Sequence, residues 1–348
     1  MSQTRAYVAS SATSGLQPGT IERREPGADD VVIDITHCGV CHTDLSQTRN
    51  EWGGSVYPLV PGHEIVGVVR AVGAAVREFR VGERVGVGTF VDGGHSLGVC
   101  AREHEHRDHK HFVPTYNGKD HEGRPTYGGY AQSIVVKQGY VLHIPDGVPS
   151  DAAAPLLCAG ITMYSPLRHW KAGPGKKVAV VGLGGLGHIA VKMAHAMGAE
   201  VTVLSQSLSK QADGARLGAD HFHATSDPET FKKLADTFDL ILVTVGATLD
   251  WNAYIGLLRM DGALVLLGIP SGPGSVDAFP LIASRKTLSG SGVGSIPECQ
   301  EMLAFCAKHG IVSDIETIPI QQIESAFERL ARGDVRYRFV IDMASLGK

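Results

Sequence analysis

One apolar segment, followed directly by a glycine-rich turn, constrains the fold of this chain most strongly. Val178–Val181 reads VAVV, the turn Gly182–Gly187 follows it, and the helix-like run His188–Met197 closes at Gly198. Continuous apolar strands that alternate with helices form parallel sheets with both faces covered. Further strands of this kind are predicted at Val201–Leu204, Leu240–Val245 and Ala263–Leu267. The second half of the chain therefore predicts a doubly wound α/β domain.

The glycine spacing in the turn fits the pattern G-x-G-x-x-G. Gly182 permits the tight turn, Gly184 lets a pyrophosphate approach the backbone, and Gly187 lets the helix pack on the strand. Helix N–H groups then face the phosphates. Because the pattern follows a strand and opens a helix, it favours a Rossmann dinucleotide site over an ordinary glycine-rich loop. The predicted binding turn comprises Gly182, Leu183, Gly184, Gly185, Leu186 and Gly187.

The end of the second parallel strand predicts which dinucleotide binds. An NAD-preferring site places Asp or Glu there, to bind the ribose 2′-hydroxyl. Here Leu204–Lys210 reads LSQSLSK, without a carboxylate. Ser205, Ser207 and Lys210 offer hydroxyls and an ammonium, which suit a 2′-phosphate. We therefore predict NADP(H), the alternative being that these serines merely begin the next helix.

The first part of the chain has a different pattern. At 348 residues the chain exceeds the size at which one core usually keeps growing, so two domains are expected. Short β-like runs, separated by glycine, proline and aspartate, precede residue 150. They are Val31–Thr36, Ile65–Val69, Arg84–Val87 and Ser133–Val136. These runs predict a β-rich domain, such as a partly open barrel. Farther on, Pro297–His309 reads as a helix, with Cys299 and Cys306 on its core face.

Charge and hydropathy exclude several classes of partner. The formal net charge of −4 offers no basic excess for a nucleic acid. No apolar stretch approaches the roughly 20 residues of a membrane span, and the N-terminus lacks a signal-peptide core. We therefore expect a cytoplasmic protein with no membrane partner. In a reducing compartment the six cysteines are metal ligands or core residues rather than disulfides.

Three motifs could hold a metal. CGVCHTD begins at Cys38, GHE begins at Gly62, and Cys158 stands alone. Taken singly, they could be two buried thiols, a turn and a core cysteine. Together with the dinucleotide pattern, the chain resembles the zinc-dependent medium-chain alcohol dehydrogenases, particularly the cinnamyl-alcohol-dehydrogenase-like branch. The resemblance covers nearly the full length and rests on GVCHTD, YPLVPGHEIVG, APLLCAGITMYSPL, VGLGGLGH and YRFVID.

The resemblance implies a division into domains and a metal site. It implies a GroES-like catalytic domain over residues 1–152, to which 286–348 return, and a Rossmann domain over 153–285. It also implies that Cys41, His63 and Cys158 bind one catalytic zinc, with Glu64 as a transient ligand. Such a Cys₂His set with an open position is the known alcohol dehydrogenase arrangement. The family further implies a homodimer.

The same resemblance assigns four residues to catalysis. Asp44 matches an acid that orients the ligand imidazole, and Glu64 matches the carboxylate near the metal. Thr43 matches the hydroxyl that begins a proton relay through the cofactor ribose. Many relatives have histidine where this chain has Ser46. A hydroxyl passes a proton but cannot store one near neutral pH, so we expect slower alcohol oxidation at neutral pH.

Further residues are assigned to the cofactor and the substrate. His42 matches a position near the pyrophosphate, and Val293, Gly294 and Ser295 match a loop that lines the nicotinamide. Trp52 and Phe90 fall near the substrate pocket, or are simply core residues. The expected reaction interconverts primary aromatic or apolar alcohols and aldehydes, and favours aldehyde reduction. The alternatives are a zinc-free quinone or enone reductase of the same fold and a non-enzymatic nucleotide-binding protein.

The segment Asp92–Phe112 reads DGGHSLGVCAREHEHRDHKHF. Many relatives bind a structural zinc here through four cysteines. The family spacing places those positions at Gly94, Leu97, Cys100 and Asp108, so only one thiol remains. We therefore predict that the structural zinc is absent. The remaining histidines could form a replacement site with Cys100 or Asp108, but a solvated loop is favoured; they are His104, His106, His109 and His111.

Overall fold

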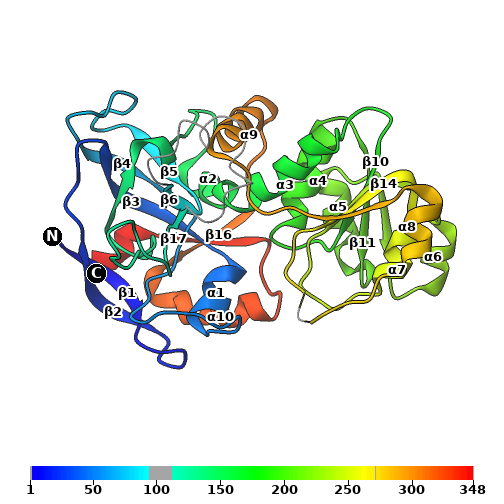
Figure 1. Cartoon of the computed structure of the whole chain (residues 1–348), viewed down its shortest axis with the longest axis horizontal. Coiled ribbons are helices and arrows are strands. Elements are labelled where there is room, and N and C mark those ends of the chain that lie inside the picture. The colour runs from blue at the N-terminus through cyan, green and yellow to red at the C-terminus, as the bar shows by residue number, and fades with distance from the viewer. Residues whose placement is uncertain (1, 94–111, 271, 348) are drawn as a thin grey trace. The chain divides into compact units, whose positions relative to one another are not determined.

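The computed structural model describes residues 2–93, 112–270 and 272–347 (Figure 1). The chain forms two compact units, unit 1 with Met1–Ile161 and Gly294–Lys348, and unit 2 with Thr162–Val293. This division lies a little beyond the predicted boundaries at 152/153 and 285/286. Helix α3 (Ala159–His169) contains the observed division between Ile161 and Thr162. Strand β15 (Thr287–Gly290) lies after the second predicted boundary but belongs to the sheet of unit 2.

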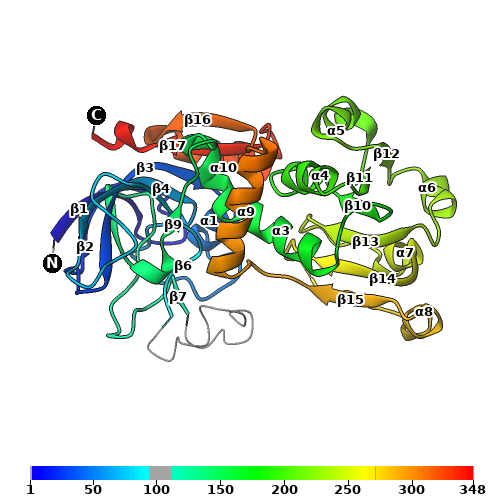
Figure 2. The ribbon, with the colours of Figure 1, turned by 90° about the horizontal axis from the view of Figure 1, so that it is seen from above.

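Unit 2 is built on a six-stranded sheet in which all neighbouring strands are parallel. Figure 2 shows the strands stacked in the order β12-β11-β10-β13-β14-β15. The remaining strands are β10 (Lys177–Val181), β11 (Glu200–Ser205), β12 (His221–Ala224), β13 (Phe238–Val243) and β14 (Leu258–Leu266). The strand order reverses at β10, between β11 and β13. In such sheets ligands bind beyond the carboxyl ends of the strands at this reversal.

Both faces of this sheet are covered. The residues Val178–Val181 are each at most 3% exposed, although successive side chains in a strand point to opposite faces. Helix α4 packs against β10 and β11, whereas α7 and α8 pack against β14. The helices are α4 (Gly187–Ala196), α5 (Gln211–Leu217), α6 (Pro228–Lys233), α7 (Trp251–Gly256) and α8 (Ala278–Ser284). The predicted doubly wound α/β domain is confirmed.

Unit 1 contains the β-rich sheet. Its order is β16-β17-β3-β4-β5-β9, with β8 also paired to β3, and all pairs are antiparallel except β16 with β17. The strands are β3 (Asp30–Val40), β4 (Ile65–Val72), β5 (Arg84–Val87), β8 (Ser133–Lys137), β9 (Leu142–His143), β16 (Ile315–Pro319) and β17 (Arg338–Asp342). Figure 1 shows the red β17 beside the blue β3, so distant segments of the chain meet in one sheet.

Shorter elements complete unit 1. Two further strand pairs are β1 (Ser2–Ala9) with β2 (Leu16–Arg23), and β6 (Phe90–Asp92) with β7 (Val113–Pro114). The helices are α1 (His42–Thr48), α2 (Ser150–Ala153), α9 (Ile296–His309) and α10 (Ile323–Ala331). The predicted β-rich domain is confirmed. In the described ranges, no helix has the length and apolar character needed to cross a membrane.

Helix α9 shows how closely local sequence determines an element. Ser295 caps the first turn of the helix, and Pro297 stands within that turn. Gly310 ends the helix with a φ of 65°. Cys299 and Cys306 are 4% and 0% exposed. They are core residues, as their spacing on the helix predicted.

Candidate metal centre and nucleotide site

Two thiols, an imidazole and a carboxylate meet inside unit 1. The ligand atoms of Cys41, His63, Glu64 and Cys158 all lie within 4.8 Å of one another. Cys41, His63 and Glu64 are buried, and Cys158 keeps partial solvent access. Two sulfurs and one imidazole nitrogen form a donor set that suits tetrahedral zinc with one open position. The structure thus brings the predicted ligands together, and their chemistry fits this metal.

The sheet explains how residues so far apart in sequence converge. Cys41 directly follows β3, and Glu64 directly precedes β4. Because these strands are antiparallel, the end of β3 lies beside the start of β4. Cys158 follows the 3-10 turn Ala154–Leu157, which contacts both strands. One end of a single strand pair therefore positions all the ligands.

Asp44 connects two of the ligand-bearing loops. It is fully buried, and its Oδ1 lies 3.0 Å from the Gly62 N–H and 3.1 Å from Nδ1 of His63. Its Oδ2 accepts from the Cys41 N–H at 2.8 Å and from the Tyr130 hydroxyl at 3.4 Å. A carboxylate partner on Nδ1 keeps the proton there and leaves Nε2 as the metal ligand. Asp44 therefore orients His63 and the start of α1 together.

The pKa values of the two thiols shift in opposite directions. The pKa of Cys41 lies well below its ordinary value, chiefly because it accepts a hydrogen bond from Cys158. The same hydrogen bond, with burial, raises the pKa of Cys158 well above its ordinary value. Burial lowers the pKa of His63, but the charge of Asp44 opposes it, and the resulting pKa is well above the ordinary value. Binding of a divalent cation would displace these protons.

Glu64 is held from the opposite side by Arg338 of β17. The two side chains form a buried ion pair. Burial raises the pKa of Glu64 to about 7, although the positive charge of Arg338 opposes this rise. A Cβ atom at Gly39 would lie 2.0 Å from Oε2 of Glu64, so glycine makes room for the carboxylate. Neither Gly39 nor Arg338 was assigned a role from sequence, although an arginine in the apolar run RFVID was the available signal.

The short helix α1 carries four of the predicted residues, the buried Asp44 among them. His42 is exposed, Thr43 is partly buried and Ser46 is 2% exposed. Thr43 and Ser46 are three residues apart, so they lie on the same side of the helix. The Ser46 hydroxyl donates to Oε2 of Glu51 at 2.7 Å, and Glu51 is exposed. Glu51 could not be predicted from the sequence, because nothing in the motif CHTDLS identifies the acceptor of the hydroxyl.

The aromatic residues predicted to line the substrate pocket have different environments. Trp52 is 46% exposed. Phe90 packs against the core of unit 1 and stacks on Phe112, with ring centroids 4.7 Å apart. A further aromatic ring, that of Tyr116, lies 5.8 Å from the ring of His63. The role of Trp52 and Phe90 in substrate binding stays a prediction.

The glycine turn of unit 2 has the geometry expected of a phosphate site. Gly182 has a φ of 92°, and a Cβ there would lie 2.4 Å from Val245. A Cβ at Gly187 would lie 2.0 Å from the Gly182 carbonyl oxygen, so helix and strand approach closely. Around Gly184, by contrast, no atom of the described residues beyond its two chain neighbours lies within 4 Å of such a Cβ. This open position beside the start of α4 fits a pyrophosphate.

Hydroxyl and ammonium groups lie next to this turn. Ser205 ends β11, which is adjacent to β10. The Ser207 and Ser209 hydroxyls are 2.9 Å apart, and the Ser207 hydroxyl also accepts from the Ser209 N–H. Lys210 donates to the Leu183 carbonyl in the turn at 2.9 Å. The residues that end β11 and follow it therefore form one cluster with the glycine turn.

The predicted nicotinamide loop crosses the division between the units. Val293 ends unit 2, and Gly294 begins the second segment of unit 1. Ser295 is 7% exposed and caps α9 by accepting from the Glu298 N–H at 3.2 Å. Ser295 therefore has a structural role whether or not it contacts a cofactor. The histidine-rich positions and the compared structural-zinc positions, residues 94–111, lie outside the described residues.

Known proteins resemble this chain over its whole length. Residues 27–146 match the family described as "Alcohol dehydrogenase GroES-like domain", and residues 185–308 match "Zinc-binding dehydrogenase". The NADP-dependent alcohol dehydrogenase C 1 of Mycolicibacterium smegmatis is 59% identical over 99% of both chains. The chain belongs to the zinc-dependent medium-chain alcohol dehydrogenases. The predicted family and the GroES-like and Rossmann folds are confirmed.

Solved structures place this alcohol dehydrogenase in the cinnamyl-alcohol-dehydrogenase-like branch. The cinnamyl alcohol dehydrogenase SbCAD4 of Sorghum bicolor matches with a TM-score of 0.95 and 44% identity, covering 99% of this chain and 98% of that one. A cinnamyl alcohol dehydrogenase from Helicobacter pylori, solved with NADP(H), matches with a TM-score of 0.90 and 37% identity, covering 98% of each chain. This alcohol dehydrogenase is thus an oxidoreductase with a zinc-binding fold.

Proposed function

We propose that this alcohol dehydrogenase interconverts primary aromatic or apolar alcohols and aldehydes with NADP(H), and that it favours aldehyde reduction. The single observation that carries the proposal is the buried cluster of Cys41, His63, Glu64 and Cys158. The glycine turn with Lys210 beside it supports a phosphorylated dinucleotide. Relatives that are named for NADP dependence or were solved with NADP(H) support the same cofactor.

The protein residues around the metal have distinct tasks. Cys41, His63 and Cys158 would hold zinc, which when bound polarises the substrate oxygen as a Lewis acid. Asp44 orients the His63 ring through Nδ1. The ion pair with Arg338 holds the Glu64 carboxylate beside the ligands. These contacts fix the donor atoms before substrate arrives, which limits the reorganisation needed during the reaction.

A proton must reach or leave the substrate oxygen when hydride is transferred by the nicotinamide. The family resemblance places Thr43 at the inner end of that path. Ser46 lies one turn further along the same side of α1 and donates to Glu51. We propose that Glu51 exchanges the proton with solvent, because its carboxylate is exposed while Ser46 is buried. The path then has a solvent-facing end without a histidine.

The cofactor is proposed to bind at the carboxyl ends of β10 and β11. The Gly182–Gly187 turn and the first N–H groups of α4 would hold the pyrophosphate. Ser205, Ser207 and Lys210 would hold the 2′-phosphate through charge-assisted hydrogen bonds. His42, Val293, Gly294 and Ser295 are the remaining proposed cofactor contacts, and Trp52 and Phe90 the proposed substrate contacts.

The decisive experiment combines metal analysis with a substrate panel. The proposal expects one zinc per chain and faster oxidation of NADPH than of NADH with benzaldehyde or cinnamaldehyde. Full activity in zinc-free protein would instead favour a quinone or enone reductase of the same fold. No detectable cofactor oxidation across a broad aldehyde panel would favour a nucleotide-binding protein without enzymatic activity. Two zinc ions per chain would contradict the predicted loss of the structural site.

The protein is further proposed to form a homodimer through the edge of its parallel sheet. In the described part of the chain, β15 pairs with β14 alone, so its outer edge has no strand partner. The neighbouring α8 exposes Phe279 by 78% and Ile282 by 74%. An unpaired edge beside exposed apolar side chains suits a second copy of the same edge.

A cytoplasmic location is also proposed, since the cysteines in the described ranges are free thiols.

A further inference from the structure

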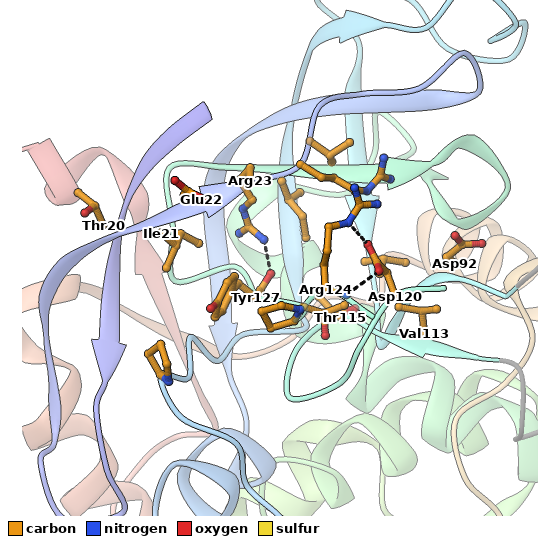
Figure 3. Close-up of a pocket in the computed structure, with 17 residues that line it drawn as sticks. Thr20, Ile21, Glu22, Arg23, Asp92, Val113, Thr115, Asp120, Arg124 and Tyr127 are labelled. Atoms are coloured by element: carbon orange, nitrogen blue, oxygen red, sulfur yellow. Dashed lines mark hydrogen bonds and ion pairs between the residues drawn. The ribbon is translucent and has the colours of Figure 1, made fainter. Parts of the chain in front are cut away.

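Unit 1 contains a cavity that shares no residue with the metal cluster. It has a volume of about 340 Å³ and lies between β2, the segment 113–127 and β8 (Figure 3). This size falls within the range of small-molecule sites. None of its lining residues belongs to the predicted catalytic, cofactor or substrate sets. The established family activity therefore leaves this cavity without a role.

The cavity contains a buried cation that no acid among the described residues neutralises. Arg23 is 7% exposed, and its two Nη atoms donate to the backbone carbonyls of Tyr127 and Gly128. Its Nε has no hydrogen-bond partner, and no carboxylate of the described residues pairs with it. A buried charge without a counter-ion is costly. Burial accordingly lowers the pKa of Arg23 to about 9.

The other arginines around the cavity already have acidic partners. Arg24 forms a two-point ion pair with the buried Asp30. Arg124 pairs with Asp120 at 2.7 Å, as the dashed lines in Figure 3 indicate. These carboxylates are therefore occupied, and Arg23 is the lining cation left without one in the described structure. A ligand that completes this site needs one negative charge.

The remaining walls define the rest of the ligand. Ile21, Val91, Val113 and Ile134 line the cavity, and each is at most 8% exposed. Such surfaces suit a short hydrocarbon body rather than a second charged group. Glu22, Asp92 and Asp120 also line the cavity, so a negative charge is favoured only where it lies beside Arg23, and a second one would be repelled. The lining therefore favours a monoanion with an apolar body.

We propose that this cavity binds a small monocarboxylate, whose head group pairs with Arg23 and whose hydrocarbon body packs on the apolar wall. A carboxylate is the planar anion that guanidinium binds best. This site is separate from the proposed aldehyde and alcohol site, and it does not depend on that activity. An aromatic or aliphatic acid of the size of benzoate fits the volume and the single charge.

The bound acid would lie close to a route that leads to the metal ligands. Arg23 holds the carbonyls of Tyr127 and Gly128, and the N–H groups of Gly128 and Gly129 donate to the carbonyls of Val60 and Gly62 at 2.7 and 2.8 Å. His63 is the next residue. Arg23 could alternatively act only as a clamp on this turn, so the test must separate ligand binding from folding.

The experiment measures benzoate binding to the zinc-loaded full chain by calorimetry, with benzamide as the neutral control of equal shape. We expect benzoate to bind and benzamide to bind at least about tenfold more weakly, because it lacks the charge. Arg23→Met should weaken benzoate binding by about tenfold or more, and Arg23→Lys should retain part of it. Arg70→Met, which removes a surface arginine paired with Asp34, should leave it unchanged.

A second variant keeps the test decisive if Arg23→Met does not fold. Val135 lines the cavity and is only partly buried. Val135→Trp fills the space without removing Arg23 and should abolish benzoate binding. Absence of binding to the unmodified protein would overturn the proposal. Binding that persists in Val135→Trp, or benzoate inhibition that is purely competitive with aldehyde, would overturn it too, since the acid would then bind at the metal centre.

Discussion

Ser46 donates a 2.7 Å hydrogen bond to the carboxylate of Glu51. Ser46 is 2% exposed, whereas Glu51 is exposed. The pair therefore connects the buried side of α1 to solvent through one hydroxyl and one carboxylate. A histidine at this position could store a proton near neutral pH, but a serine hydroxyl cannot. The Glu51 carboxylate can instead exchange the proton directly with solvent.

Replacement of Ser46 by histidine should speed alcohol oxidation near neutral pH. The new imidazole would lie beside Glu51, and a positioned general base typically contributes on the order of tenfold or more. The measurement is the pH–rate profile of alcohol oxidation, which should gain an inflection near neutrality. Glu51→Gln should slow oxidation in the unmodified background, and Glu78→Gln, at an exposed position, should not. An identical pH–rate profile in Ser46→His would contradict the relay.

Asp44→Asn should loosen the metal centre. The substitution weakens the contact that fixes His63 Nδ1 and the hydrogen bond to the Cys41 N–H. Loss of such a supporting carboxylate typically lowers metal affinity by roughly 10- to 100-fold. Competition with a chelator, followed by metal analysis, measures this directly. The matched control is Asp34→Asn, which removes a surface ion pair with Arg70; equal zinc retention in both variants would refute the role of Asp44.

Ser205→Asp should shift the cofactor preference from NADPH toward NADH. A carboxylate at the end of β11 repels a 2′-phosphate but accepts from a ribose 2′-hydroxyl. We expect kcat/KM for NADPH to fall by roughly tenfold or more, with a much smaller effect on NADH. The ratio of the two kcat/KM values is the readout. A ratio that does not change would place the 2′-phosphate elsewhere.

Asp30→Asn should destabilise unit 1 in a pH-dependent way. Asp30 is fully buried; burial raises its pKa, but hydrogen bonds from Arg24 and Gly27 outweigh this and lower it below 3.8. Its ion pairing therefore stabilises the fold at pH values above the unfolded pKa, and this stabilisation is lost as the pH falls through the folded pKa. Removing one partner of a buried pair costs about 3 kcal/mol.

Thermal unfolding measured from pH 7 to pH 3 tests this prediction. The midpoint of Asp30→Asn should lie below that of the unmodified protein at pH 7, and the two should converge toward pH 3. Asp146→Asn provides the control, because Asp146 is fully exposed and lies 3.9 Å from Arg84. A midpoint difference that is constant with pH would show that the ion pair is not its cause.

Ile282→Asp should weaken self-association. The side chain is 74% exposed on α8, beside the unpaired edge of β15, and a charge there would be buried without a partner in a dimer. Light scattering after size exclusion should give twice the chain mass for the unmodified protein and a lower mass for the variant. Val81→Asp changes an equally apolar, 65% exposed residue in unit 1 and should have no effect. A monomeric unmodified protein would rule out the dimer.

The sequence predicted most of what depends on local pattern. The strand at 178–181 and its glycine turn were identifiable because every side chain there has to be small or apolar. The partners Arg338 and Glu51 were not identifiable, because each acts through a contact made by folding. Arg338 meets Glu64 only when β17 joins the sheet. The burial of Arg23 could not be predicted either, because an arginine in a polar stretch gives no indication that its side chain points inward.

The ion pair between Glu64 and Arg338 joins residues 274 positions apart in sequence. During synthesis, the ligand-bearing loops leave the ribosome long before the strand that supplies the arginine. The thiols and the carboxylate are therefore synthesised well before the arginine that pairs with Glu64. Contacts of such sequence separation form slowly. Metal delivered to the nascent chain would therefore meet its cysteines before Arg338 holds the Glu64 carboxylate in place.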